Sequence, residues 1–439
     1  MNTVALITFG CAKNLIDSEV MLGYLQRAGY HFVSDPVAAD IIILNTCGFI
    51  RPAKDEAEVA IRDALKNKSN RSSTKIIVTG CYAERYKETL RNKYPSVDAW
   101  VGVKDFDKIV QVVRGERFSV SSRTFLYSHA SPRAVSTPIG SAYVKISEGC
   151  SHRCSFCAIP LIKGTYRSRP IASIFEEAQA LAARGVKEIN LISQDTTYFG
   201  RDQNKTEGLP RLLQKLNHVR GIEWIRLLYG YPEEITDRLL EVMQDPKICP
   251  YLDIPFQHSD PVLIHKMKRA MDGRRALKLL HKIRQKIPSI SIRTSLIVGF
   301  PGERLKEFES LIHFVKEARF DHLGVFTYSR EEGTSAESLG DPVPERVKRN
   351  RKDKILDIQA EISSENLKPY VGRTIAVLVE GTWQNNSHLL VGRGQFQAPE
   401  VDGCVFVEAP IDRHPLSSPL QKVEILASDV YDLHGRFAR

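Results

Sequence analysis

Three apolar runs in the first third of the chain each end in a cysteine, and this repeat limits the possible folds more than any other feature of the sequence. The runs are Val4 to Cys11, Ile41 to Cys47 and Lys75 to Cys81. Between them lie stretches with helical character, one opening near Asp17 and one over residues 54–66. Alternating strands and helices predict a parallel sheet, whose strands are buried on both faces and therefore contain continuous apolar runs.

These three cysteines occupy equivalent positions, just beyond the ends of the predicted strands. Ligands of open α/β sheets bind outside the carboxyl ends of the strands, so we expect Cys11, Cys47 and Cys81 to converge on one site. A single cysteine would be interpreted as a buried thiol, which is its commonest environment. Three at matching positions favour a three-thiolate metal site, with buried thiols as the alternative.

A second group of three cysteines has the spacing C-x3-C-x2-C, with Cys150, Cys154 and Cys157 inside one short loop. Structural zinc takes four protein ligands, whereas an iron–sulfur cube is held by cysteine thiolates on separate irons. Three thiolates therefore leave one iron open for chemistry. A zinc half-site or chance core thiols are the alternatives, and His152 is interpreted as a loop residue rather than a fourth ligand.

The length of 439 residues is enough for about three domains. The sequence has neither a leader-like start nor an apolar stretch long enough to cross a bilayer, so we expect a soluble, cytoplasmic protein with no membrane association. Eight cysteines in such a chain indicate metal or redox ligands rather than disulfides. Cys249 and Cys404 stand outside both groups of three and are predicted to be packing residues.

A linker rich in Ser and Pro is predicted at residues 119–139, before a second strand-and-helix region. The strand candidates of this region are residues 142–146, 188–192, 224–228, 251–255, 290–298 and 322–328. Helical segments such as 174–184 and 274–287 separate them. Six strands with helical crossovers predict a partial (β/α)6 barrel, in which the carboxyl ends of the strands form the reactive face. The loop that begins at Cys150 follows the first strand and is expected at that face.

The chain changes in composition from residue 343 onward. A charged helix is predicted over residues 343–369, with a solvated face as its default interpretation and a nucleic-acid contact as the alternative. Short β-rich runs from Thr374 onward, separated by Gly, Pro and Asn, predict a small β-barrel. The predicted domains are an α/β domain at 1–118, a linker at 119–139, a partial barrel with its exit helix at 140–369, and a β-barrel at 370–439.

The charge of the chain is unevenly distributed. The net charge is +10, which favours an anionic partner such as RNA or an RNA-rich particle. Residues 370–439 carry a net charge of −2, so residues 1–369 carry +12. A domain that grips RNA needs Lys and Arg to displace counterions from phosphates, so the mildly acidic terminal barrel suits a basic protein partner better.

The full length of the chain resembles the radical S-adenosylmethionine (SAM) methylthiotransferases. That family combines an N-terminal three-cysteine domain, a radical SAM barrel and a C-terminal TRAM β-barrel, and its cluster motif matches residues 150–157, including Phe156 before the last cysteine. Residues 10–19, 251–258 and 398–403 resemble the RimO type, which methylthiolates an aspartate of a small-subunit ribosomal protein. They differ from the MiaB type, which acts on an adenosine in tRNA.

This resemblance implies two [4Fe-4S] clusters and SAM as cofactors. One cluster would be held by Cys150, Cys154 and Cys157, which would activate SAM, and the other by the N-terminal cysteines, which would supply the sulfur. The net reaction would replace C–H by C–S–CH3 at an unactivated carbon, and the resemblance implies the β-carbon of an aspartate. The partners implied are a basic ribosomal protein, on its own or on the ribosomal subunit, and an electron donor such as flavodoxin or ferredoxin.

The resemblance also suggests neighbours for SAM, but no catalytic side chain is assigned. The suggested neighbours are Phe156, Ser193, Gln194, Arg293 and Gly299. Each has a structural alternative: residues 193–195 as a polar turn at a strand end, the glycine as a backbone requirement, and the arginine as an ion pair in the barrel wall.

Two rival functions remain open from the sequence. A tRNA adenosine methylthiotransferase of the MiaB type would have the same clusters and chemistry but a different acceptor. A non-catalytic RNA-binding protein would instead use its cysteines to hold structural zinc. The acidic terminal barrel argues against the first, and the two groups of three cysteines argue against the second.

Overall fold

The computed structural model describes residues 2–384, 386–409 and 418–438. The chain divides into two compact units. The first comprises Met1–Ser136, Lys145–Ile174 and Ser329–Ser338, and the second comprises Thr137–Val144, Phe175–Tyr328 and Leu339–Arg439.

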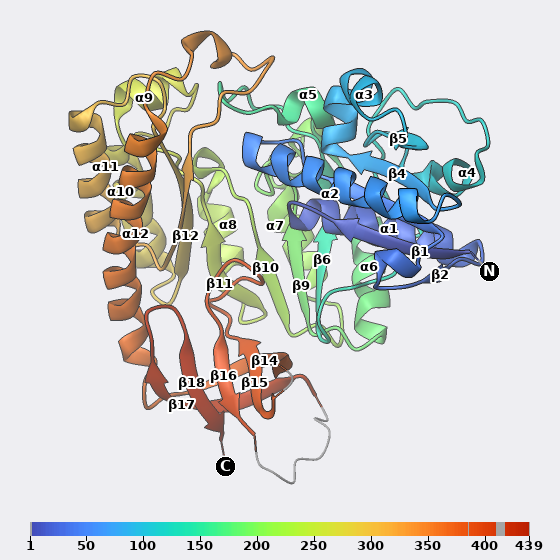
Figure 1. The fold of residues 1–439 in the computed structure, drawn as a ribbon. Coiled ribbons are helices and arrows are strands. Elements are labelled where there is room, and N and C mark those ends of the chain that lie inside the picture. The colour runs from blue at the N-terminus through green and yellow to red at the C-terminus, as the bar shows by residue number, and fades with distance from the viewer. Residues whose placement is uncertain (1, 385, 410–417, 439) are drawn as a thin grey trace. The chain divides into compact units, whose positions relative to one another are not determined.

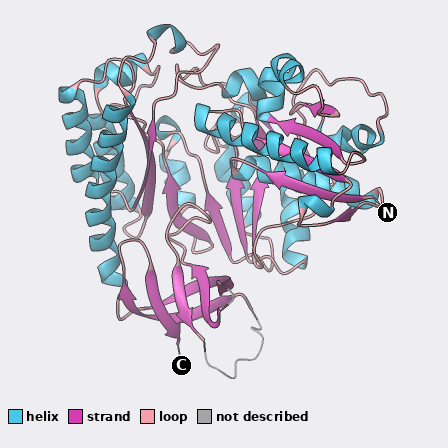
Figure 2. Ribbon diagram, viewed as in Figure 1, coloured by secondary structure: helices cyan, strands magenta, loops and turns pink. Residues whose placement is uncertain are grey.

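A five-stranded parallel sheet forms the centre of the first unit, with strand order β2-β1-β3-β4-β5 (Figures 1 and 2). Its strands are β1 (Thr3–Thr8), β2 (His31–Phe32), β3 (Ile41–Thr46), β4 (Lys75–Gly80) and β5 (Ala99–Val101). The helices around it are α1 (Ala12–Arg27), α2 (Arg51–Asn70), α3 (Cys81–Lys93) and α4 (Ile109–Arg114). The predicted parallel α/β domain is therefore confirmed. Two short strands, β2 and β5, were not predicted.

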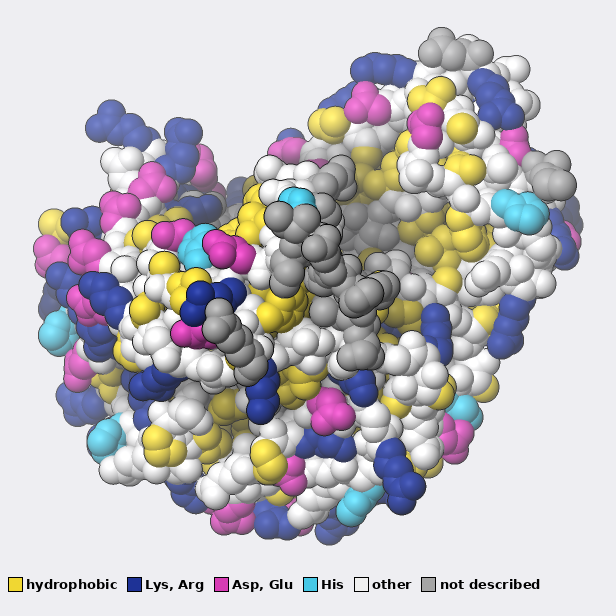
Figure 3. All heavy atoms as spheres, turned by 90° about the horizontal axis from the view of Figure 1, so that it is seen from below, with side chains coloured by type: hydrophobic (Ala, Val, Ile, Leu, Met, Phe, Trp, Pro, Cys, Tyr) yellow, Lys and Arg dark blue, Asp and Glu magenta, His cyan; other side chains and the backbone are white. Residues whose placement is uncertain are grey.

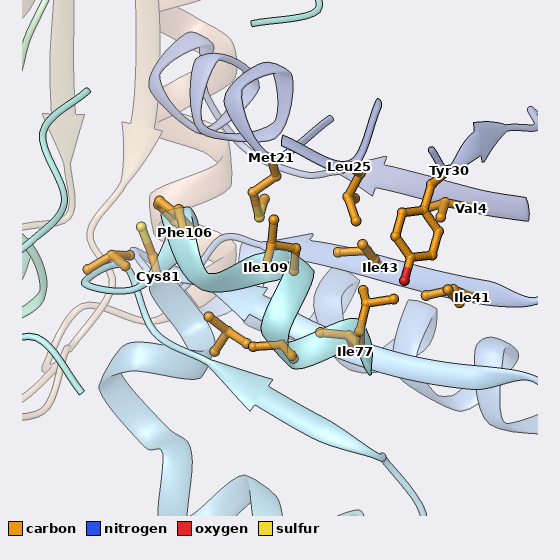
Figure 4. Packing of buried hydrophobic residues seen from close by; sticks show 14 of the residues in the cluster. Val4, Met21, Leu25, Tyr30, Ile41, Ile43, Ile77, Cys81, Phe106 and Ile109 are labelled. Atoms are coloured by element: carbon orange, nitrogen blue, oxygen red, sulfur yellow. The ribbon is translucent and has the colours of Figure 1, made fainter. Parts of the chain in front are cut away.

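The sheet is buried on both faces, as its continuous apolar runs predicted. In β3, Ile41 and Ile43 pack in one hydrophobic cluster, which also contains Met21 of α1 (Figure 4). The alternating residues Ile42 and Leu44 pack in a second cluster, with side chains of α2 and α3. Successive side chains of a strand point to opposite faces, so one run of apolar residues supplies both layers of the core.

The segment predicted as a linker is held against α1. The amide of Ala134 donates to the carbonyl of Glu19 at 2.9 Å, and the buried Glu19 carboxylate pairs with Arg133 at 2.6 Å. Gly23 in the middle of α1 gives this segment room, because a Cβ there would lie 2.4 Å from the backbone of Pro132. The Ser- and Pro-rich composition thus produces an extended segment with fixed partners.

The loop elements that complete the first unit are short. They are β7 (Ser147–Glu148), α5 (Ile159–Lys163) and β8 (Arg167–Ser168). Strands β7 and β8 pair antiparallel and enclose the cysteine loop between them.

An open six-stranded sheet forms the main part of the second unit, with strand order β13-β12-β11-β10-β9-β6. Its strands are β6 (Ser141–Lys145), β9 (Glu188–Ile192), β10 (Trp224–Leu227), β11 (Ile248–Asp253), β12 (Ser291–Val298) and β13 (His322–Thr327). The connecting helices are α6 (Ile171–Ala183), α7 (Gly208–Leu216), α8 (Asp237–Val242), α9 (Pro261–Lys266), α10 (Gly273–Lys286) and α11 (Leu305–Ala318), and α12 (Glu345–Leu367) follows the last strand. The six predicted strands are all present in this sheet.

In this sheet the other predicted strand boundaries agree to within one residue, and only β11 differs by more. Strand β11 begins at Ile248, three residues before the predicted start, and ends at Asp253 rather than at Pro255. Pro250 lies inside it, and the pairing of β10 with β11 shifts register between Ile225 and Leu227. Proline lacks a ladder donor and is tolerated at such irregularities, so it obscured the start of the strand in the sequence.

The terminal domain is a closed β-barrel with strand order β14-β15-β16-β18-β17, as predicted. Its strands are β14 (Thr374–Trp383), β15 (Asn386–Arg393), β16 (Val405–Glu408), β17 (Leu420–Ser428) and β18 (Leu433–Phe437). A buried ion cluster joins it to the six-stranded sheet within the second unit. Glu188 of β9 pairs with Arg226 of β10 at 2.8 Å and with Arg393 of β15 at 2.6 Å. Within the described ranges, no helix is both long and apolar enough to span a bilayer.

Candidate functional site

The three N-terminal cysteines follow three adjacent parallel strands. Cys11 is the N-cap of α1 after β1, Cys47 follows β3, and Cys81 is the first residue of α3 after β4. Because β3 pairs with β1 on one side and with β4 on the other, the three residues lie along one edge of the sheet. The structure thus brings together the residues that the sequence singled out.

Gly10 explains how β1 approaches its neighbour so closely. Its φ is +94°, and a Cβ built on it would lie 2.8 Å from the Cβ and 3.0 Å from the Sγ of Cys47. Glycine adopts positive φ without steric cost. Any other residue here would be strained and would also press on the Cys47 side chain.

Burial sets the electrostatic character of this group of thiols. Burial raises the pKa of Cys47 to about 11 and the pKa of Cys81 to about 12. The charge of Lys163 acts in the opposite direction on Cys81. The Cys81 thiol lies 3.6 Å from the side-chain oxygen of Asn14. Buried thiols of this kind become thiolates readily only with a nearby positive charge, and the irons of a cluster would supply one, so the donor set fits such a group.

The second group of cysteines lies in the loop between β7 and β8. Cys150 donates its amide to Gly164 at 3.0 Å, and Cys157 donates its amide to the carbonyl of Cys154 at 3.2 Å. All three side chains are half-buried. Gly149, with φ of +79°, lets the loop start next to the returning chain, because a Cβ there would lie 2.3 Å from the carbonyl oxygen of Thr165.

The two groups of cysteines belong to the same compact unit. Helix α5, which directly follows Cys157, packs against α3, which begins with Cys81. Ala158 and Ile162 share one hydrophobic cluster with Cys81 and Phe106, and Figure 4 shows Cys81 beside Phe106 at the edge of that cluster. The segment that carries one group is therefore in contact with a residue of the other.

A buried group of four charged residues lies in the same region: Asp17 of α1, Lys145 of β6, Glu148 of β7 and Lys163 of α5. Asp17 is in hydrogen-bond contact with Lys145 and pairs with Lys163 at 3.1 Å. Glu148 pairs with Lys145 at 2.8 Å and lies 3.7 Å from Lys163. All four side chains are at most 3% exposed. Two cations and two anions thus compensate one another.

The ionic state of this group follows from its contacts. Burial acts against the charged form of Glu148, yet Lys145 and Lys163 lower its pKa to about 2. Burial likewise acts against charged Lys163, but Asp17 and Glu148 raise its pKa well above the ordinary value. None of these four residues was predicted from the sequence as part of a charged group. Their only signal was a set of charged residues inside otherwise apolar or cysteine-bearing segments, which does not reveal the partners.

The suggested SAM neighbours are placed on two different units. Phe156 is half-buried in the cysteine loop of the first unit. Ser193 and Gln194 follow β9, and Gly299 follows β12, so these three lie at the carboxyl ends of strands in the second unit. Ser193 is buried, with its hydroxyl 3.5 Å from that of Thr196.

One suggested neighbour, Arg293, and the residue beside another, Asp195, have structural partners that match the alternatives. Asp195, next to Gln194, accepts hydrogen bonds from the amides of Thr197 at 2.9 Å and Tyr198 at 3.2 Å, as a polar turn requires. Arg293 is the third residue of β12 and pairs with the buried Asp402 at 2.5 Å. Arg293 therefore belongs to the amino-terminal half of its strand, and its guanidinium is paired with Asp402.

The two remaining cysteines belong to the second unit, whereas both groups of three belong to the first. Cys249 is fully buried in β11, and burial raises its pKa to about 12. Cys404 is half-buried, and its thiol lies 3.4 Å from the carboxylate of Asp432. In the part of the chain that the structure describes, no three His, Cys, Asp or Glu side chains are arranged to hold a single metal ion. A cluster is held differently, because each thiolate binds its own iron.

Three protein-family models match the chain in succession. They are Uncharacterized protein family UPF0004 at residues 3–102, the Radical SAM superfamily at residues 144–315, and the TRAM domain at residues 371–437. Together these matches cover most of the chain.

Curated relatives match over almost the full length. A protein of Pelobacter propionicus named ribosomal protein uS12 methylthiotransferase RimO is 46% identical, over 92% of each chain. Proteins with the same name from an Anaeromyxobacter species and from Geobacter sulfurreducens are 45% and 43% identical, each over 98% of this chain and over 92% and 98% of their own.

Solved structures share the fold at low sequence identity. TsrM of Kitasatospora setae, a radical SAM methyltransferase solved with cobalamin and a [4Fe-4S] cluster, has a TM-score of 0.54 and 15% identity, over 76% of this chain and 77% of its own. The cobalamin-dependent radical SAM enzyme OxsB has a TM-score of 0.51 and 14% identity, over 82% of this chain and 56% of its own.

Proposed function

Because the chain belongs to the RimO family of radical SAM methylthiotransferases, which use SAM and two [4Fe-4S] clusters, we propose that it methylthiolates ribosomal protein uS12. The acceptor in this proposal is the β-carbon of an aspartate. The tRNA-modifying alternative has less support, since the full-length relatives carry the RimO name.

One structural observation supports the proposal most directly. Three adjacent parallel strands each deliver a cysteine to one edge of a sheet, and the C-x3-C-x2-C loop belongs to the same compact unit. We assign one cluster to Cys11, Cys47 and Cys81, and the other to Cys150, Cys154 and Cys157. When bound, the clusters and SAM supply radical chemistry and sulfur transfer, which protein side chains alone do not provide.

The chain itself binds and shields these groups. Cys81 is buried and Cys47 is half-buried, which limits the access of water to both thiols, and Lys163 contributes a positive charge beside Cys81. Ser193, Gln194 and Gly299 lie at carboxyl ends of strands, where sheets of this kind bind ligands, and we propose them as SAM contacts together with Phe156. Arg293 is left out of this set because its guanidinium is engaged with Asp402.

The remaining parts of the proposal concern domains and partners. The domains are residues 1–118, 140–369 and 370–439, and each contains one of the three family matches. The mildly acidic terminal barrel is proposed to favour a basic protein target. A small electron-transfer protein such as flavodoxin or ferredoxin is proposed to reduce the clusters, and the site of action is the cytoplasm, where ribosomal proteins are found.

The test is a direct assay of acceptor choice. Anaerobically reconstituted protein is incubated with SAM, a reductant and either purified uS12 or tRNA, and the products are analysed by mass spectrometry. We expect one hydrogen of uS12 to be replaced by a methylthio group at an aspartate, with tRNA unchanged. Modification of tRNA alone would overturn the proposal.

A further inference from the structure

Helix α10 has an unusual charge composition. Its sequence, Gly273–Lys286, contains six Lys or Arg residues and no Asp or Glu. Among the helices of ten or more residues in the described chain, α10 has the largest imbalance: α2 has five basic and four acidic residues, and α12 has six and five. On the face of the molecule drawn in Figure 3, Lys and Arg side chains are likewise interspersed with Asp and Glu.

The Lys and Arg residues from Lys266 to Lys286 fall into two classes. Arg269 is partly buried and donates to the carbonyl of Pro255 at 2.8 Å. Lys282 and Lys286 pair with Asp237 of α8 at 2.9 and 2.6 Å, and Arg284 donates to the carbonyl of Ala318 at 2.7 Å, so these three stabilise the packing of the helix. Five others are exposed and form no ion pair with a described acidic side chain. We call these five residues the basic strip: Lys266, Lys268, Arg274, Arg275 and Lys278.

The acidic residues near the basic strip have other partners. Asp260 and Asp272 are the N-caps of α9 and α10 and accept hydrogen bonds from backbone amides. Glu233 accepts from the amide of Ala270 at 3.3 Å, and Asp237 holds Lys282 and Lys286. The positive charge of the basic strip is therefore not balanced locally.

Helix stability does not explain the basic strip. Arg274 and Arg275 lie in the first turn of α10, where the helix dipole favours acidic residues and disfavours basic ones. Alternating charges four residues apart would stabilise an exposed helix, whereas like charges at that spacing, as at Arg274 and Lys278, destabilise it slightly. The placement thus carries a small energetic cost that a polyanionic ligand would offset.

The basic strip begins beside a loop of the proposed active site. Gly302 belongs to the loop that follows β12, and a Cβ on it would lie 2.6 Å from the ammonium of Lys266. On α10 the strip covers the first two turns, from Arg274 to Lys278, about 6 Å along the helix axis at 1.5 Å per residue. A ligand along the strip would therefore approach the carboxyl end of the sheet in the second unit.

We propose that the basic strip binds the phosphate backbone of ribosomal RNA next to the target protein. This inference rests on the proposed function, because a ribosomal protein target brings RNA with it. A basic target protein would be repelled by the strip, whereas RNA phosphates match it in charge and in extended shape. The acidic terminal barrel and the basic strip would then engage the protein and the RNA separately.

The first test is the salt dependence of RNA binding, measured with fluorescent poly(U) RNA. Removing three charges in the triple variant Arg274→Gln, Arg275→Gln, Lys278→Gln should reduce the slope of log K against log salt by about 2, at about 0.7 per phosphate contact. The matched control is the triple variant Arg62→Gln, Lys66→Gln, Arg91→Gln, which removes the same charge from exposed positions on α2 and α3. Its slope should match that of the unaltered protein.

The second test compares free uS12 with intact small ribosomal subunits as substrates. The strip variant should methylthiolate free uS12 at the normal rate but act on subunits at least several-fold more slowly, while the control variant is normal on both. The inference is overturned if the slope of log K for RNA binding against log salt is the same in the strip variant and the unaltered protein. It is also overturned if the strip variant loses binding only to an acidic electron-transfer protein. Failure of the unaltered protein to modify free uS12 would instead count against the proposed function. The salt dependence of RNA binding is measured without uS12 and would still test the basic strip.

Discussion

Asp17 and Lys163 pair at 3.1 Å although 146 positions separate them in the chain. Asp17 lies on α1, the helix that starts at Cys11, and Lys163 ends α5, the helix that follows Cys157. Both side chains are almost fully buried. One ion pair thus links the two segments that carry the two groups of cysteines within the first unit.

Replacing Asp17 should be strongly destabilising. Asp17→Asn leaves Lys145 and Lys163 buried with only Glu148 as an anion, and loss of one partner of a buried ion pair costs about 3–5 kcal/mol. The free energy of unfolding, measured by urea denaturation under anaerobic conditions, checks this.

The matched control for that measurement is Asp63→Asn on α2. Asp63 is 60% exposed and pairs with Lys66 at 3.0 Å on the surface. Its loss should change stability by about 0.5 kcal/mol or less. Equal effects of the two variants would contradict a buried, mutually compensated ionic group.

Gly10 should be essential for the N-terminal cluster. Gly10→Ala places a methyl group 2.8 Å from the Cβ of Cys47, so the cysteine must move. We expect iron content to fall toward that of a single cluster per chain, measured by iron and sulfide analysis after anaerobic reconstitution.

Gly29→Ala is the control that distinguishes the effect of the contact with Cys47 from the effect of backbone strain. Gly29 also has positive φ, at +87°, but a Cβ there would meet nothing within 4 Å. Both variants should lose about 1–2 kcal/mol of stability from the unfavourable φ, and only Gly10→Ala should lose iron. Full iron content in Gly10→Ala would refute the assigned role of this contact.

Replacing a cysteine of one group should block a different step of the reaction from replacing a cysteine of the other group. Cys154→Ala should abolish SAM cleavage, whereas Cys47→Ala should retain SAM cleavage and lose methylthiolation. Release of 5′-deoxyadenosine and modification of uS12, both followed by mass spectrometry, distinguish the two steps.

Cys404→Ala is the control for both cysteine variants. Cys404 is half-buried and lies next to Asp432, outside both groups. It should keep the full iron content and both activities. The assignment of a cluster to Cys150, Cys154 and Cys157 is wrong if Cys154→Ala cleaves SAM normally.

Alkylation of the metal-free protein should show the effect of burial on Cys47. Because burial raises its pKa to about 11, the thiolate fraction at pH 8 is about 100-fold lower than for an ordinary thiol with a pKa near 9. The alkylation rate of an ordinary thiol levels off above its own pKa, whereas that of Cys47 should continue to rise about tenfold per pH unit through pH 10.

Iodoacetamide labelling followed by peptide mass spectrometry measures this pH profile. A small model thiol in the same tube serves as the reference. The shape of the profile, rather than the absolute rate, is the readout, because limited access slows Cys47 at every pH equally. A plateau near pH 9 for Cys47 would show that its pKa is not raised.

The sequence by itself determined the architecture and the grouping of the cysteines into two sets of three. Continuous apolar runs fix buried parallel strands, and a cysteine directly after a strand must lie at the carboxyl edge of the sheet. For this reason Cys11, Cys47 and Cys81 could be grouped without a structure. The C-x3-C-x2-C loop is recognisable because its ligands are close in the chain.

Only the tertiary structure decided which distant charges meet. Nothing local indicates that Lys163 faces Asp17, that Arg293 pairs with Asp402, or that the segment around Ala134 is bound to α1. Periodicity and spacing report on a residue's neighbours along one helix, strand or loop. Ion pairs across more than 100 residues depend instead on how complete elements pack, and that packing is a property of the whole fold.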